Sequence, residues 1–237
     1  MAHHWKDLNG FEVLTFDCYG TLIDWEAGIL AALRSATGVD ARQDDDALLE
    51  AYAGYEAALE AGPWLPYREV LARALSAVCG DLGRAPTAEQ ADELGSSVAD
   101  WRPFPDSVDA LVRLRRRFRL GIITNCDDDL FEHSNEYLGR PFDWVITAQQ
   151  ARAYKPALSV FELALERIGR PRERILHVAQ SLFHDHVPAR SLGLSTAWIN
   201  RRHDRPGFGA TPAAAATPDL VAQDMATFAD LVLARSQ

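Results

Sequence analysis

Apolar residues recur with two different periods along the chain, and the change of period divides it into regions. Between residues 24 and 102 they return every three or four positions, the period of a helix with one buried face. The alternation that is typical of strands is nearly absent there. The pattern therefore predicts an all-helical insertion, or cap, with helices over residues 29–36, 46–61 and 68–78.

The pattern changes after the sequence Pro-Phe-Pro at residues 103–105. Short apolar runs now alternate with amphipathic segments, as in a parallel sheet whose strands are joined by right-handed helical crossovers. The predicted strands cover residues 11–16, 120–124, 144–147, 175–179 and 195–199, and the predicted helices between them cover residues 106–117, 159–168 and 186–192.

The last part of the chain begins with a loop. Residues 201–218 are rich in Pro, Gly, Ala and Thr, and residues 219–233 then predict a strand or turn followed by a final helix. The fold class is therefore α/β, a Rossmann-like parallel sheet core flanked by helices, with an all-helical cap insertion. We expect residues 1–23 and 103–237 to form the core domain and residues 24–102 to form the cap domain.

Composition narrows the range of partners. The formal charge of −10 argues against nucleic acid, whose binding needs a basic face. No apolar stretch is long enough to span a membrane, and the first residues lack the apolar core of a signal sequence. Three scattered cysteines make a disulfide or zinc framework improbable. We expect a cytoplasmic protein that acts on a small molecule, and a homodimer is an open alternative to a monomer.

An aspartate stands where the first predicted strand ends. Asp17 follows the apolar run 11–16, and Gly20 then turns the chain. Open α/β sheets hold their ligands at the carboxyl ends of their strands. Asp17 is therefore a candidate nucleophile, and the alternative is an ordinary turn or capping aspartate.

The sequence Asp17-Cys18-Tyr19-Gly20-Thr21 resembles the first motif of the haloacid dehalogenase superfamily. The resemblance implies that Asp17 is a covalent nucleophile and that Gly20 and Thr21 shape the turn behind it. In the phosphatases of that superfamily, a second aspartate two residues later protonates the leaving alkoxide. Tyr19 stands there instead, and a halide needs no proton when it leaves. The motif is similar to that of type II haloacid dehalogenases, Asp-x-Tyr-Gly-Thr.

Two further strand ends carry polar residues that this resemblance assigns to the site. Thr124 and Asn125 follow a strand and can donate hydrogen bonds to a substrate carboxylate or a departing halide, unless they form an ordinary strand-to-turn transition. Lys155 would lie beside Asp17 and keep its carboxylate ionised. Without the other motifs, Lys155 would be interpreted as an exposed lysine before a helix.

The last motif separates the dehalogenase and phosphatase interpretations. Residues 178–185 align with the phosphatase pattern Gly-Asp-Ser-Leu-x-x-Asp, but Gln180 replaces the acid that holds magnesium there. Because an amide brings no charge to a hard cation, we expect no metal and no cofactor. In the family reading Asp185 places the hydrolytic water and Ser181 binds the substrate carboxylate. Of the two flanking histidines, we expect His184 to face the site, where it could activate water, rather than bind a metal.

The predicted cap departs from the dehalogenase pattern. Its helix over residues 48–61 has no arginine to hold the halide, and Phe161 stands where the family has a tyrosine six residues after the lysine. Arg68 is the nearby cation that could replace the arginine, or else a solvent-exposed side chain at a helix start. The rings of Trp64 and Tyr67 are further candidates.

The sequence thus predicts a metal-independent hydrolase that releases halide from short 2-haloalkanoic acids through an ester on Asp17. The alternatives are a phosphatase of the same fold with an atypical metal site and a non-catalytic binding protein. The chain length of the substrate and the identity of the halogen are not encoded in these motifs.

Overall fold

Six parallel strands form one sheet in the computed structural model, which describes residues 10–38 and 44–234. Residues 1–9, which include the chain start without an apolar signal core, lie outside these residues. So do residues 39–43 of the predicted cap and residues 235–237 of the predicted core. The strand order is β3-β2-β1-β4-β5-β6. The strands are β1 (Val13–Phe16), β2 (Arg119–Thr124), β3 (Trp144–Thr147), β4 (Ile175–Ala179), β5 (Ser195–Ile199) and β6 (Leu220–Ala222).

The strand predictions are confirmed. β3, β4 and β5 have the predicted bounds, β2 begins one residue earlier, and β1 is shorter than the predicted run. Every residue of β1 and β4 is buried, because helices cover both faces of a parallel sheet. This is why these strands read as continuous apolar runs rather than as alternating ones.

The sheet order turns at β1, and this fixes where a ligand can bind. β1 pairs with β2 on one side and with β4 on the other, so that Phe16 lies beside both Ile122 and Val178. The chain therefore runs from β1 through β2 to β3 on one side of the sheet, and from β4 through β5 to β6 on the other. A crevice forms at such a switch point, outside the carboxyl ends of the strands, and Asp17 is the first residue beyond that edge.

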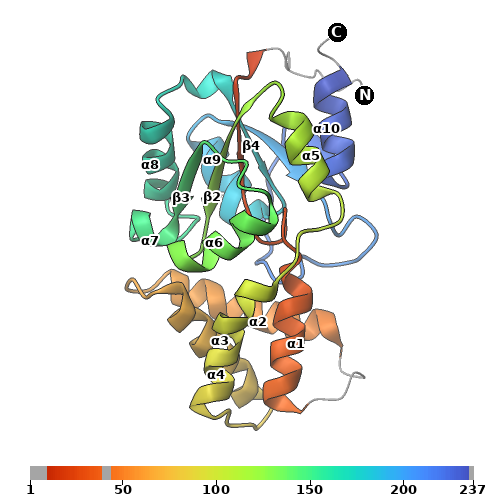
Figure 1. The fold of residues 1–237 in the computed structure, drawn as a ribbon. Helices are drawn as coiled ribbons and strands as arrows, with labels where there is room; N and C mark the ends of the chain where they lie inside the picture. The colour runs from red at the N-terminus through yellow and green to blue at the C-terminus, as the bar shows by residue number, and fades with distance from the viewer. Residues whose placement is uncertain (1–9, 39–43, 235–237) are drawn as a thin grey trace.

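Helices flank the sheet as the alternation predicted (Figure 1). One boundary was wrong: the predicted helix 106–117 ends at Leu114, because residues 115–118 turn to enter β2. A turn of π-helix precedes α9, where the sequence predicted an α-helix from residue 186. The helices that flank the sheet are α5 (Ser107–Leu114), α6 (Asp128–Tyr137), α7 (Ala148–Ala151), α8 (Leu158–Ile168), η3 (Arg172–Arg174), η4 (Leu182–His186), α9 (Val187–Ser191) and α10 (Met225–Ala234).

Residues 25–100, between β1 and α5, are mostly helical and form a layer below the sheet in the view of Figure 1. Within this helical layer α3 packs against both α2 and α4, and α1 packs against α4. The division of the chain into a core and a cap domain at residues 23 and 103 stays a prediction. The elements are α1 (Trp25–Thr37), α2 (Asp45–Glu60), α3 (Tyr67–Asp81), α4 (Ala88–Ser97) and η2 (Val98–Asp100).

Ion pairs join the helical layer to the loop after β5. The buried guanidinium of Arg202 donates to Glu26 at 2.8 Å and to Asp46 at 2.5 Å, which ties the loop to α1 and the start of α2. Such pairs hold the layer over the carboxyl edge of the sheet. None of the helices in the described residues combines the length and the apolar character that a membrane crossing requires.

Candidate active site

Three charged side chains from separate segments meet at the carboxyl edge of the sheet. Asp17 follows β1, Lys155 follows α7, and Asp185 lies in η4. The Nζ of Lys155 donates to Asp17 Oδ1 at 2.9 Å, to Asp185 Oδ1 at 2.7 Å and to the carbonyl of Ile123 at 2.9 Å. An ammonium has three donors, so all of them are used. The lysine binds two carboxylates and one strand end.

The turn after Asp17 positions the other oxygen of its carboxylate. Thr21 donates from Oγ1 to Asp17 Oδ2 at 2.5 Å and accepts at 2.9 Å from the backbone amide of Gln180. Gly20 has a φ of +83°, and a Cβ there would lie 2.9 Å from the indole nitrogen of Trp25. The glycine is therefore required both by the backbone conformation and by the close ring.

Each of these three charged groups shifts the pKa of the others. Burial raises the pKa of Asp17, and the Lys155 ammonium opposes that shift. Burial alone would lower the pKa of Lys155, but the two carboxylates outweigh burial and raise it. Burial would raise the pKa of Asp185, yet Lys155 and His177 hold it well below its usual range. Lys155 is thus charged and Asp185 ionised at neutral pH.

A buried histidine supports Asp185 from inside the sheet, and the sequence analysis missed it. His177 in β4 contacts Asp185 Oδ1 through Nε2 at 2.9 Å and Thr15 Oγ1 through Nδ1 at 2.9 Å. It is completely buried. The only signal in the sequence was a histidine inside an otherwise apolar strand. Its contacts fix the orientation of the Asp185 carboxylate.

Asn125, the first residue after β2, lies close to Lys155. Asn125 accepts from the backbone amide of Lys155 at 2.7 Å, and its Nδ2 donates to the carbonyl of Lys155 at 3.0 Å and to Glu60 at 3.1 Å. Both hydrogens of its amide group are therefore engaged. Thr124 is fully buried, and its hydroxyl has no hydrogen-bond partner among the described residues. The predicted donation from these two residues to a halide stays a prediction.

The π-turn η4 brings two side chains of the last motif to the site. Ser181 caps the turn by accepting from the backbone amide of His184 at 3.0 Å. His184 and Asp185 then both point inward, whereas His186 contacts the carbonyl of Ala179 at 3.0 Å. Burial lowers the pKa of His184 to about 4, so its imidazole is neutral at pH 7. Single π-turns of this kind are frequent at functional sites.

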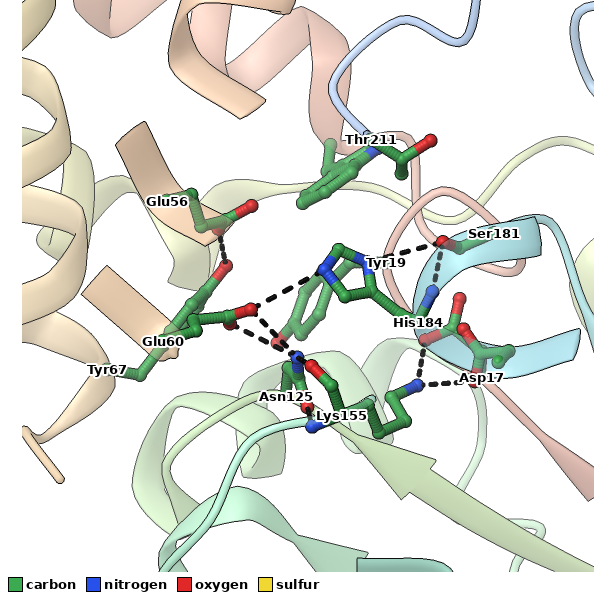
Figure 2. A pocket seen from close by; sticks show the side chains of 12 residues that line it. Asp17, Tyr19, Glu56, Glu60, Tyr67, Asn125, Lys155, Ser181, His184 and Thr211 are labelled. Carbon is green, nitrogen blue, oxygen red and sulfur yellow. Dashed lines mark hydrogen bonds and ion pairs between the residues drawn. The ribbon is translucent and has the colours of Figure 1, made fainter. Parts of the chain in front are cut away.

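A small cavity, with a volume of about 30 Å³, opens at Asp17, between the sheet edge and the helical layer. Figure 2 shows its side chains, with those of α2 and α3 facing those of the strand ends. Lys155, Asp185, Asn125, Ser181, His184 and Tyr19 line it from the strand ends. The remaining lining side chains are Trp25, Glu56, Glu60, Tyr67 and Thr211.

Two buried glutamates of α2 were missed by the sequence analysis. Oε1 of Glu56 accepts from the hydroxyls of Tyr52 at 2.7 Å and Tyr67 at 2.8 Å, and burial raises the pKa of Glu56 to about 7. Glu60 lies 3.5 Å from Nε2 of His184, and burial together with Glu56 raises its pKa. The signal was their spacing, since both acids continue the apolar face of α2.

Tyr19 and Gln180 differ in their relation to the cavity. Tyr19 lines it, while its hydroxyl contacts Ser134 at 3.1 Å and Cys126 at 3.4 Å. Gln180 instead lines a neighbouring pocket beside Arg201, and its side-chain oxygen has no partner among the described residues. Gln180 is therefore not among the residues that line the cavity at Asp17.

The structure does not bring Arg68 or Trp64 to this cavity, which corrects the prediction that they complete the site. Arg68 donates to Asp129 at 2.8 Å, and its side chain is 46% exposed. The acid at the start of α6 attracts it away from the cavity. Trp64 stacks on Tyr154 with ring centroids 5.0 Å apart and lines a separate pocket. Phe161 packs against His177 within the core.

Among the described residues, no group of three or more His, Cys, Asp or Glu side chains is arranged to hold a metal ion. Lys155 pairs with both Asp17 and Asp185. The position of the lysine makes this pair of carboxylates an ion-pair network.

Comparisons with known proteins agree with this architecture. The family model for haloacid dehalogenase-like hydrolases matches residues 11–181. Haloacetate dehalogenase H-2 of Moraxella sp. (strain B) is 30% identical over 197 residues, which are 80% of this chain and 86% of that protein.

Solved structures give the same result. The L-2-haloacid dehalogenase RSc1362 has a TM-score of 0.79 and 25% identity, covering 94% of this chain and 99% of that one. An L-2-haloacid dehalogenase from Xanthobacter autotrophicus, with chloropropionic acid covalently bound, has a TM-score of 0.77 and 20% identity, covering 94% and 98%. By its sequence match and its fold, the chain belongs to the haloacid dehalogenase-like hydrolase family.

Proposed function

We propose that this protein hydrolyses carbon–halide bonds of short halogenated carboxylic acids through a covalent ester on Asp17. Asp17 Oδ attacks the carbon that bears the halogen, the carbon–halide bond breaks, and the halide leaves with its electron pair. Water then attacks the carboxyl carbon of Asp17 and releases the hydroxylated product. The relatives named as haloacetate and haloacid dehalogenases support this reaction class.

The observation that carries the proposal is the position of Asp17. Its carboxylate lines the cavity and accepts a hydrogen bond from Lys155 on one oxygen and from Thr21 on the other. A nucleophile held in this way needs little reorganisation before attack. The neighbouring phenol of Tyr19 also fits halide displacement, because this reaction has no leaving alkoxide to protonate.

The second step needs a group that orients or activates water. Asp185 keeps its charge through Lys155 and His177, and its Oδ2 has no hydrogen-bond partner among the described residues. Neutral His184 lines the same cavity and can accept a proton. We assign water placement to Asp185 and proton acceptance to His184, which agrees with the roles that the sequence suggested.

The residues present do not fit a magnesium site. The position that supplies a carboxylate in related phosphatases is Gln180, whose neutral amide is a poor ligand for a hard cation and lies beside a different pocket. This supports a reaction without metal. The proposed reaction therefore uses no metal ion.

Isotope labelling tests the ester. In water enriched in oxygen-18, a single turnover on 2-chloropropionate should place one labelled oxygen in the peptide that contains Asp17, and unlabelled oxygen should appear in the first product. Mass spectrometry of the digested protein measures this directly. Label in the first product and none in Asp17 would mean direct attack by water, and the ester mechanism would be abandoned.

Chelation tests the metal and the phosphatase alternative. Halide release should be unchanged by a chelator, with an equal amount of the calcium-loaded chelator as the control. Hydrolysis of small phosphate esters that vanishes with chelator, without any halide release, would instead identify a phosphatase. A homodimer stays a prediction that neither assay addresses.

A further inference from the structure

The cavity at Asp17 is nearly closed in this conformation. Its volume of about 30 Å³ has room for about two water molecules, and all but two of the residues that line it are buried. The two with intermediate exposure are Glu60 and Asn125, which hydrogen-bond to each other at 3.1 Å. The side chain of Glu60 is only 4% exposed, so its carboxyl group closes the cavity where the wall comes nearest to solvent.

A larger pocket lies on the other side of Glu60. This space, the Trp64 pocket, has a volume of about 350 Å³ and is formed by α2, the turn after it, residues 152–157 and Phe183. Glu60 lines both the pocket and the cavity. His184 lines the cavity, and its neighbour Phe183 lines the pocket. At Glu60 the two spaces are therefore separated by a single side chain.

One cation in the Trp64 pocket has no anionic partner. The guanidinium of Arg152 lies over the ring of Trp64, with its Cζ 5.1 Å from the ring centroid. Trp64 is itself stacked on Tyr154, so two packed rings support the cation. Arg152 is exposed, and within residues 10–38 and 44–234 no carboxylate pairs with it. Its side-chain donors are therefore available to an anion that enters the pocket.

The electrostatics of the pocket favour an anion. Arg152 ends α7 in the left-handed conformation, with a φ of +53°, where glycine is the ordinary residue. Among the described residues of the pocket, Arg152 and Glu60 alone are of a charged type. Burial and Glu56 raise the pKa of Glu60, which favours its neutral form. In a protein with a formal charge of −10, the pocket is thus a place where a small anion is attracted rather than repelled.

We propose that the Trp64 pocket is the entry site of the substrate, where Arg152 binds the carboxylate of the halogenated acid. The substrate passes to Asp17 when the side chain of Glu60 leaves its present contacts (Figure 2). Arg152 takes no part in bond cleavage, so it acts on KM rather than on kcat. This inference rests on the proposed function, because it concerns how the molecule that Asp17 attacks reaches the cavity.

Filling the pocket tests whether it is the entry. Ala57 lies on its α2 wall, and Ala57→Trp should lower kcat/KM for 2-chloropropionate by at least about tenfold. Ala58→Trp places the same ring at the next, exposed position of α2 and should change kcat/KM by less than about twofold. Ala157→Trp fills the pocket from another wall and should repeat the loss, so the result does not depend on the folding of one variant. An unchanged kcat/KM in Ala157→Trp, or equal effects at positions 57 and 58, would overturn the entry site.

Calorimetry with unreactive ligands tests the cation separately. Propionate and propionamide share a three-carbon frame, and at about pH 8 only propionate is charged. Arg152→Gln should weaken propionate binding by at least about fivefold and change propionamide binding by less than about twofold, whereas Arg152→Lys should retain most of the affinity for propionate. Arg84→Gln removes an exposed arginine outside the pocket and should change neither.

The outcomes separate this inference from the proposed function. No measurable binding of propionate to wild type, or equal effects of Arg152→Gln and Arg84→Gln, would overturn the role of Arg152. Propionate binding needs no bond cleavage. Arg152-dependent binding without any halide release would therefore count against the proposed function alone, and halide release without Arg152-dependent binding would count against the entry site alone.

Discussion

The two sides of the cavity surround their buried carboxyl groups with different partners. On the strand side, Asp17 and Asp185 share the ammonium of Lys155. On the helical side, Glu56 accepts hydrogen bonds from two phenols. Glu60 accepts a hydrogen bond from the amide of Asn125 and lies near the neutral imidazole of His184. The pKa of Asp185 is accordingly lowered, whereas that of Glu56 is raised to about 7.

The difference shows that burial does not by itself decide the charge of a carboxyl group. Burial raises the pKa on both sides, and at Asp185 the Lys155 ammonium together with the contact to His177 outweighs it. The strand side can therefore keep a fixed anion for chemistry at neutral pH. The helical side can change its charge with pH. Four experiments test this comparison.

The largest effect is expected at the nucleophile. Asp17→Asn should lower halide release by at least about 10³-fold, roughly 4 kcal/mol of transition-state stabilisation, because an amide cannot form the ester. Steady-state halide release measures it, with circular dichroism as a check of folding. Asp109→Asn, an exposed acid of α5, is the matched control. A variant that retains a tenth of the activity would remove Asp17 from the role of nucleophile.

Removal of the shared cation should destabilise the strand side. Lys155→Met leaves two buried carboxylates without a counter-ion, and the free energy of unfolding should fall by about 3–5 kcal/mol. Urea unfolding at about pH 7 measures the change. Arg170→Met alters a side chain that is 56% exposed and should change stability by less than about 1 kcal/mol. Similar values for the two variants would mean that Lys155 does not stabilise these carboxylates.

The helical side should show the opposite dependence on pH. Glu56 has a pKa of about 7 in the folded protein, against an ordinary value of 4.5, so the folded state binds more protons between these values. Its contribution to stability is present below about pH 4.5 and is lost as the pH rises through 7. Relative to wild type, Glu56→Gln should therefore gain about 2–3 kcal/mol between about pH 4.5 and pH 8.

Urea unfolding at several pH values measures this gain. Glu50→Gln, on the exposed face of the same helix, should follow the wild-type curve at every pH. Parallel curves for wild type and Glu56→Gln would show that Glu56 has the same pKa in the folded and the unfolded protein, and the contrast between the two sides would fail.

The smallest effect is expected at Arg68, which the sequence had suggested as a halide cradle. Its ion pair with Asp129 is exposed on both sides, 46% and 66%. Arg68→Ala should change halide release by less than about twofold and stability by less than about 1 kcal/mol. Kinetics and urea unfolding of the same preparation measure both. A tenfold loss of activity would mean that Arg68 acts in the cavity during turnover.

Features that depend on neighbours in the chain could be predicted from the sequence. The periods of apolar residues gave the strands, most helices and the helical segment between β1 and β2, because burial imposes a period on each element. Asp17, Lys155 and Asp185 could be placed together because their motifs resemble those of the haloacid dehalogenase superfamily, and because the carboxyl ends of parallel strands meet at one edge. The helix before β2 was predicted too long, since periodicity does not report where a turn begins.

Tertiary structure decided which side chains complete the cavity. Glu56 and Glu60 occupy positions on α2 that a solvent-exposed helix could equally carry, and they become buried only because α2 packs over the sheet edge. The Glu60–Asn125 contact joins residues 65 positions apart. Arg68 turned away because Asp129 lies beside it in space, 61 positions later in the chain. Such contacts depend on how the helical layer meets the sheet, and the local pattern of the sequence does not determine that geometry.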